Sequence, residues 1–216
     1  MKFKDIIVYN EMMILKPEKT NLKFLELKIE EDNEDLEYYF LKSIDISKIN
    51  SSKSNLPFIN EIPLEYKNIF KQNYNSNKSF KERFDNNLKK IKEFISNKNT
   101  VLYCLENSEA FFIQENEIFL INLNPDDSIS FASRSLDRLK SFMNDESYSL
   151  YSRPKINTNQ SLSKIFDIIE FLCKKKNWKD FLIKGQDKAR HKLYEKFLPK
   201  RFKNVIVLKD HFKVIL

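Results

Sequence analysis

Two apolar segments near the N-terminus predict β-strands. They cover Asp5 to Lys16 and Leu22 to Ile29, with the turn-forming residues 17–21 between them. The second segment alternates apolar and polar side chains, as expected of a half-buried strand. The aromatic residues within Leu36 to Ile46 also favour a strand. The polar, proline-containing stretch from Ser47 to Pro63 predicts an exposed loop.

From Ser79 onward, the spacing of apolar residues changes from alternation to a helical period. Apolar residues recur there every three or four positions, which predicts a helix from Ser79 to Ile95. Ser79 is expected to cap this helix, with Glu82 completing a capping box three residues later. The apolar face consists of Phe80, Phe84, Leu88, Ile91 and Ile95.

Short apolar runs separated by turn residues predict a three-strand meander from Thr100 to Leu123. Its turns are expected at Asn107-Ser108 and Glu115-Asn116. A polar proline turn at Asn124 to Asp127 ends the meander. A short helix is expected from Ser135 to Met143.

The C-terminal third begins after a polar stretch, Ser152 to Gln160. Helical periodicity follows from Ser161 to Lys174 and again from Gly185 to about Leu198, where Pro199 is expected to stop the helix. The last apolar runs predict a β-hairpin around Lys209-Asp210, with its final strand docked into a sheet.

Strands and helices occur in separate runs, which favours an α+β fold over a parallel α/β fold. We expect an antiparallel sheet, made of the N-terminal strands and the meander near 100–123, packed with helices. A basic, mostly helical subdomain ending in a β-hairpin follows. The predicted domains are an α+β body at 1–151 and the basic subdomain at 158–216, docked on the body.

Charge is segregated between these two regions. The 216-residue chain has a net charge of +7, yet the residues after Ser149 hold 17 Lys and Arg against 6 Asp and Glu. An AT-rich genome would raise lysine along the whole chain, but it does not explain why acids are scarce only in this region. Such a basic end is typical of proteins that bind a polyanion, nucleic acid first.

Composition excludes several kinds of chemistry. The one glycine, Gly185, excludes glycine-rich phosphate loops, and two histidines leave little for a zinc site. Cys104 and Cys173 lie among apolar neighbours and indicate buried, reduced thiols. The N-terminus lacks the uninterrupted apolar run of a signal peptide, and no run is long enough to cross a membrane. We therefore expect a cytoplasmic protein that uses no cofactor and no metal.

The basic region supplies the candidate binding residues. Lys184, Lys188 and Lys192 begin a series that recurs every fourth residue and forms one stripe on the predicted helix, which phosphates would neutralise. The full set of candidate nucleic-acid contacts is Lys174, Lys175, Lys176, Lys184, Lys188, Arg190, Lys192, Lys196, Lys200 and Arg201.

Three interpretations of this region stay open. The lysines either form a solvated surface, contact DNA or RNA phosphates, or contact an acidic protein. The third interpretation describes an interaction module, such as an immunity protein, an antitoxin or an accessory subunit. Scarce arginine argues against base-specific reading. The two helices around Gly185 resemble a helix-turn-helix, but their spacer is longer than that motif's turn. The aromatic residues Trp178, Phe181, Tyr194 and Phe202 are expected in the core rather than as stacking platforms.

An enzymatic alternative rests on Glu26 and Lys28. A carboxylate and a lysine two residues apart on a strand suit a magnesium-dependent nuclease, with Asp126 or Glu18 as the second carboxylate. Such triplets also arise by chance in a chain rich in acids and lysines. Asp137 is expected to pair with Arg134 or Arg138, and His191, one turn from Asp187 and Glu195, is expected to be a surface histidine in a charged helix. Our leading hypothesis is a non-enzymatic protein, with no catalytic residue, that binds DNA or RNA phosphates.

Overall fold

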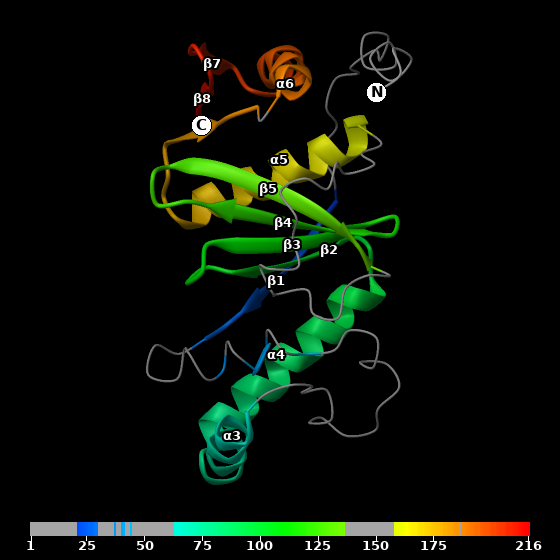
Figure 1. Cartoon of the computed structure of the whole chain (residues 1–216), viewed down its shortest axis with the longest axis vertical. Coiled ribbons are helices and arrows are strands. Elements are labelled where there is room, and N and C mark those ends of the chain that lie inside the picture. The colour runs from blue at the N-terminus through cyan, green and yellow to red at the C-terminus, as the bar shows by residue number, and fades with distance from the viewer. Residues whose placement is uncertain are drawn as a thin grey trace. The chain divides into compact units, whose positions relative to one another are not determined.

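The computed structural model in Figure 1 describes residues 21–29, 37, 40, 41, 44, 63–136, 158–185 and 187–216. The fold of these residues is α+β, as predicted. Eight strands form one sheet in the order β1-β2-β3-β4-β5-β6-β8-β7. The sheet is mixed rather than wholly antiparallel, because β1 pairs parallel with β2 and β5 pairs parallel with β6.

The chain divides into two compact units. The meander unit contains the described residues of 21–121 and 131–154. The C-terminal unit contains 122–130 and the described residues of 155–216. The predicted domain boundary at 151–158 falls almost entirely outside the described residues, so that division stays a prediction.

In the meander unit, the predicted strand at 22–29 is confirmed as β1 (Lys23–Leu27). The predicted three-strand meander is confirmed as β2 (Thr100–Cys104), β3 (Glu109–Gln114) and β4 (Glu117–Leu123). Positive φ angles of 57° at Ser108 and 56° at Glu115 mark the two expected turns. The strand predicted at 5–16 and the loop predicted at 47–63 lie outside the described residues, except Pro63.

A strand that the sequence analysis did not predict, β5 (Ser128–Ser135), follows the polar turn at 124–127. Asp127 has a φ of 60° in this turn, and the Asn124 backbone N–H donates to the carbonyl of Ser128 over 2.8 Å. The turn therefore reverses the chain into another strand instead of ending the sheet. The helix predicted at 135–143 is wrong at Ser135, which ends β5, and its residues beyond Leu136 lie outside the described ranges.

Two helices precede β2 in the meander unit. The predicted helix is confirmed as α4 (Lys78–Ser96), but its cap is Asn77 rather than Ser79. The Asn77 side chain accepts from the Phe80 backbone N–H over 3.0 Å, which satisfies a donor that the helix leaves open. The preceding helix, α3 (Leu64–Ser76), was not predicted because it buries only Phe70 and Tyr74 among its 13 residues.

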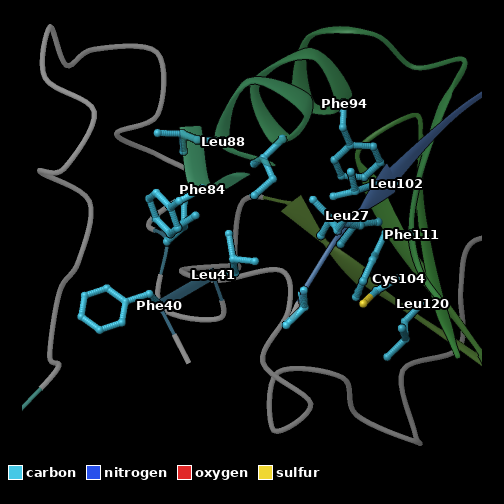
Figure 2. Close-up of a cluster of buried hydrophobic side chains, with 14 of the residues drawn as sticks. Leu27, Phe40, Leu41, Phe84, Leu88, Phe94, Leu102, Cys104, Phe111 and Leu120 are labelled. Carbon is cyan, nitrogen blue, oxygen red and sulfur yellow. The ribbon is translucent and has the colours of Figure 1, made fainter. Parts of the chain in front are cut away.

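The aromatic core of the meander unit explains one wrong prediction. Glu37, Phe40 and Leu41 are helical and not part of a strand. Their spacing places them on one helix face, and Phe40 stacks on Phe70 with 3.9 Å between ring centroids. Figure 2 shows Phe40, Leu41 and Phe84 among the buried side chains of this core. Tertiary packing thus overrides the strand propensity of the local aromatic residues.

The C-terminal unit alternates helices and strands. It contains α5 (Thr158–Lys175), β6 (Asp180–Ile183), α6 (Lys188–Arg201), β7 (Asn204–Val207) and β8 (Phe212–Ile215). The predicted hairpin is confirmed, and β8 docks against β6 as expected of the final strand. The sequence analysis missed β6, which occupies the long spacer between the helices. With a strand between them, α5 and α6 do not form a helix-turn-helix.

Pro199 lies inside α6 and does not end it. Proline has a backbone φ angle compatible with a helix, although it lacks one hydrogen-bond donor and its ring crowds the carbonyl four residues earlier; Pro199 is exposed in the last turn. The helix is closed one turn later, where the Phe202 backbone N–H donates to the Leu198 carbonyl over 2.8 Å.

Candidate polyanion interface

Helix α6 begins with a well-defined cap. The Asp187 side chain accepts from the Arg190 backbone N–H over 2.8 Å. Gly185 approaches the same turn closely, since a Cβ atom there would lie 2.5 Å from the His191 backbone nitrogen. Lys188 is therefore the first helical residue. Lys184 precedes the helix, contrary to the prediction that placed it on the same stripe.

The buried face of α6 fixes which side chains face outward. Tyr194, Phe197 and Leu198 are buried. Phe197 stacks on Phe166 of α5 with 5.4 Å between centroids, and Tyr194 meets Phe212 of β8 edge-on at 6.4 Å. This packing gives the helix one defined orientation in its unit.

The opposite face of α6 carries lysines at every fourth position. We call Lys188, Lys192, Lys196 and Lys200 the lysine stripe, and all four are exposed. Four residues advance a helix by about 6 Å, so the stripe spans about 18 Å. Lys200 was predicted as a contact but not as part of the stripe. Extending the four-residue spacing past Pro199 would have found it.

Arg190, Arg201 and Lys184 each form an ion pair within the C-terminal unit. Arg201 is only 6% exposed and lies 2.5 Å from Asp167 and 2.9 Å from Glu170 on α5. Lys184 pairs with Asp210 at 2.8 Å, and Arg190 lies 3.9 Å from Asp187. These three predicted contacts therefore have internal partners, which weakens their candidacy as phosphate ligands.

The same ion pairs account for most acids of the region. Residues 158–216 contain six acids, and five of them pair with Lys or Arg within the unit. The five are Asp167, Glu170, Asp180, Asp187 and Asp210. Glu195 is the sixth, on the exposed side of α6. In the described part of the chain, Lys188, Lys192 and Lys196 have no acidic partner within ion-pair distance. The positive charge of these three lysines is therefore directed at solvent.

The remaining candidates lie at the end of α5. Lys174 and Lys175 are exposed in its last turn, where cations offset the negative end of the helix. The Lys175 ammonium also lies 5.7 Å from the centre of the Phe171 ring. Lys176 is half-buried. Lys174 and Lys175 therefore have a structural explanation, which also applies to Lys200 in the last turn of α6 but not to Lys188, Lys192 and Lys196.

Three of the four aromatic residues of the region are core residues, as expected. Phe181, Tyr194 and Phe202 are buried, and Trp178 is half-buried. Phe181 meets Phe202 edge-on with 5.8 Å between centroids. None of these three buried rings offers an open face on which a nucleic-acid base would stack.

The nuclease residues Glu26 and Lys28 lie at β1 and just beyond it. The Lys28 backbone is held by Asn87, and the Glu26 carbonyl accepts from the Lys90 ammonium over 2.5 Å. Asp126 caps its own turn by accepting from the Ser128 hydroxyl over 2.6 Å. This is a structural role in the turn predicted at Asn124 to Asp127. Within the described residues, no group of three or more His, Cys, Asp or Glu side chains is placed to hold a metal ion.

In the part of the chain that the structure describes, no helix is long and apolar enough to cross a membrane. The chain matches no family model, no curated protein and no solved structure. A functional interpretation therefore depends on the residues themselves. The lysine stripe is the strongest candidate for a ligand-binding surface.

Proposed function

We propose that this protein binds the phosphate backbone of DNA or RNA through the lysine stripe of α6. The observation that carries the proposal is the exposure of Lys188, Lys192 and Lys196 on one helix face, with no acid of the described residues within ion-pair distance of any of them. Like charges at a four-residue spacing destabilise a helix by a few tenths of a kcal/mol per pair. A bound polyanion removes this repulsion and gains entropy by releasing its counterions.

The proposed binding is non-specific. Bidentate arginine contacts are the commonest means of reading guanine, and Arg201 is buried against Asp167 and Glu170. Lysine acts as a flexible point charge that suits a phosphate without fixing a base.

Salt dependence tests the proposal, because each neutralised phosphate adds a defined slope. For a duplex, log K is expected to fall with log[salt] with a slope of about −0.9 per phosphate contact, hence about −3.6 for four lysines. The stripe variant Lys188→Gln/Lys192→Gln/Lys196→Gln is expected to keep a slope of only about −0.9. Fluorescence anisotropy of a labelled duplex across a potassium chloride series measures both.

The matched control is Lys78→Gln/Lys81→Gln/Lys89→Gln. These lysines are also exposed and lie on α4 of the meander unit, where Lys78 is 3.8 Å from Glu82. The control changes net charge by the same amount, so its slope is expected to equal that of the wild type. Equal losses of slope in the two triple variants would show that net charge, and not the stripe, causes binding. No binding at about 50 mM salt would refute the proposal outright.

A further inference from the structure

Among the described residues, the β7–β8 hairpin leaves an open sheet edge. β7 is the last strand in the sheet order, and in the described part of the chain it pairs only with β8. Their antiparallel register joins Asn204 to Ile215 and Val207 to Phe212. The other side of β7 is the edge at which a further strand would be added.

The phase of the ladder shows which backbone groups point to that edge. The Leu208 backbone N–H donates to the His211 carbonyl over 2.9 Å, so these two residues form a hydrogen-bonded pair. In an antiparallel ladder, hydrogen-bonded pairs alternate with non-hydrogen-bonded pairs. Ile206 therefore bonds to β8, whereas Val205 and Val207 direct their N–H and C=O groups outward.

The side chains at this edge are apolar and exposed. Ile206 is 46% exposed, Val207 is 55% exposed and Leu208 is 39% exposed. Val205 and Val207 lie on the α6 side of the strand, because their partners Val214 and Phe212 are buried there. Successive strand residues point to opposite faces, so the edge presents apolar side chains on both faces of the sheet.

The positive charge beside β7 favours an acidic strand at this edge over a second copy of β7. Lys203 and Lys209 flank β7, both are exposed, and neither has an acidic partner within the described residues. If two copies paired through β7 about a two-fold axis at Ile206, Lys203 of each copy would face Lys209 of the other. Like charges placed opposite each other destabilise a strand pair. An acidic strand would instead be stabilised, because its carboxylates would lie beside the two lysines.

We propose that β7 accepts an extended, acidic segment of a partner protein as the next strand of the sheet. The outward backbone groups of Val205 and Val207 bind its main chain, and its apolar side chains cover Val207 and Ile206. Carboxylates near its ends, six residues or about 20 Å apart, pair with Lys203 and Lys209. The lysine stripe takes no part in this interaction, so it holds whether or not nucleic acid binds α6.

Two fluorescent peptides of about ten residues test the proposal. Both have the same alternating Val/Thr core, one with two glutamates at each end and one with two lysines. We expect anisotropy to show binding of the glutamate peptide, and binding of the lysine peptide at least tenfold weaker. Equal binding of the two peptides, or binding of neither, would refute the proposed occupant.

Backbone pairing is tested by Val207→Pro, with Val207→Thr as the matched control. Proline removes the outward N–H of Val207 while Ile206 and Leu208 keep their bonds to the neighbouring strand, and edge strands tolerate proline. The proline variant is expected to lose glutamate-peptide binding at least tenfold, and the threonine variant to keep it. If both variants bind equally well, the peptide does not add to the sheet at β7.

A charge-reversed variant, Lys203→Glu/Lys209→Glu, keeps the strand and is expected to exchange the peptide preference. The stripe variant Lys188→Gln/Lys192→Gln/Lys196→Gln is expected to bind the glutamate peptide as the wild type does. Loss of peptide binding in the stripe variant would place the acidic peptide on α6 and overturn the proposal. A wild-type dimer in sedimentation that Val207→Pro abolishes would identify a second copy as the occupant and would also overturn it.

Discussion

Arg201 of α6 lies 2.5 Å from Asp167 of α5, and both side chains are largely buried, with 6% and 12% of their surfaces exposed. Arg201 also donates from its Nε to Glu170 over 3.1 Å. One guanidinium thus bridges two carboxylates on the neighbouring helix. This arrangement suits arginine, whose planar donors are fixed in direction. It makes Arg201 a residue that holds α6 against α5.

We predict that Arg201→Met destabilises the protein without altering its salt-dependent binding. Removing one partner of a buried ion pair leaves the other charge without compensation, so the free energy of unfolding is expected to fall by about 3 kcal/mol. Urea unfolding followed by circular dichroism measures this loss. The duplex-binding slope of the folded variant is expected to match the wild type. A slope smaller by about 0.9 with unchanged stability would instead identify Arg201 as a phosphate contact.

We predict that the lysine stripe lowers the free energy of unfolding while it strengthens duplex binding. Lys192→Glu places a carboxylate between Lys188 and Lys196 and replaces two repulsive spacings with two attractive ones, which outweigh the one new repulsive spacing to Glu195. At low ionic strength this is expected to raise the free energy of unfolding by about 1 kcal/mol while weakening duplex binding. Urea titrations and anisotropy at the same salt concentration measure the two effects. A stripe that served only the fold would show loss of stability in this variant.

Periodicity predicted the elements whose own side chains form a face. The helix α4 buries one regular face, whereas the strands β2, β3 and β4 are short apolar runs buried along most of their length and bounded by turn residues. α3 buries only two of its 13 residues, and β6 alternates buried and half-buried positions over only four residues, so both were missed. The helical residues Phe40 and Leu41 were assigned to a strand because their helix is defined by contacts with Phe70, distant in sequence.

The candidate site was predicted in part, for a similar reason. Lysine spacing alone identified Lys188, Lys192 and Lys196 as one exposed face. It also included Lys184, because the sequence does not show that Asp187 caps the helix one turn later. Nor does it show that Arg201 faces α5, since that depends on which helix packs beside it. Local spacing predicts a helix face, whereas the partner of each charge is set by tertiary packing.

Asn87 of α4 joins the helix to the end of β1, and its removal is predicted to be costly. Its side chain accepts from the Lys28 N–H over 3.2 Å and donates to the Lys28 carbonyl over 2.8 Å. It also donates to the buried carboxylate of Glu37 over 3.1 Å. Asn87→Ala is expected to lower the free energy of unfolding by about 3 kcal/mol, because buried polar groups lose their partners.

Asn87→Asp provides a second test of this junction. It places a carboxylate beside Glu37, so repulsion adds to the lost donor at neutral pH, and protonation relieves that repulsion as pH falls. The stability of Asn87→Asp relative to Asn87→Ala is therefore expected to improve from about pH 7 to about pH 4. Urea unfolding at the two pH values measures the difference. A constant difference would show that Glu37 and residue 87 are not in contact.

Asp210, in the β7–β8 turn, has a carboxyl group with a lowered pKa. Hydrogen bonds from Lys184 and then His211 lower the pKa of Asp210 from 3.8 to about 2. Because the folded pKa lies below the ordinary value, the stabilisation is complete above about pH 4 and is lost as pH falls through about 2. An NMR titration of the Asp210 carboxyl carbon is expected to show this midpoint. In Lys184→Met the midpoint is expected to move back toward 3.8; an unmoved midpoint would contradict the ion pair.

The two cysteines report separately on the two compact units. Cys104 belongs to the meander unit and Cys173 to the C-terminal unit, and both thiols are buried, which raises the pKa of each to about 12. A thiol reacts as its thiolate, so both are expected to react with a disulfide reagent at pH 8 only when their unit opens. Labelling of the native protein should be at least about 1,000-fold slower than in urea.

The single variants Cys104→Ser and Cys173→Ser leave one thiol each, so the labelling rate then measures the opening of one unit. In the Cys104→Ser background, Arg201→Met is expected to accelerate labelling of Cys173, because the bridge between α5 and α6 is lost. In the Cys173→Ser background, Asn87→Ala is expected to accelerate labelling of Cys104. Native labelling within about tenfold of the rate in urea would contradict the burial of that thiol. Equal acceleration of both thiols by either variant would show that the two units open together.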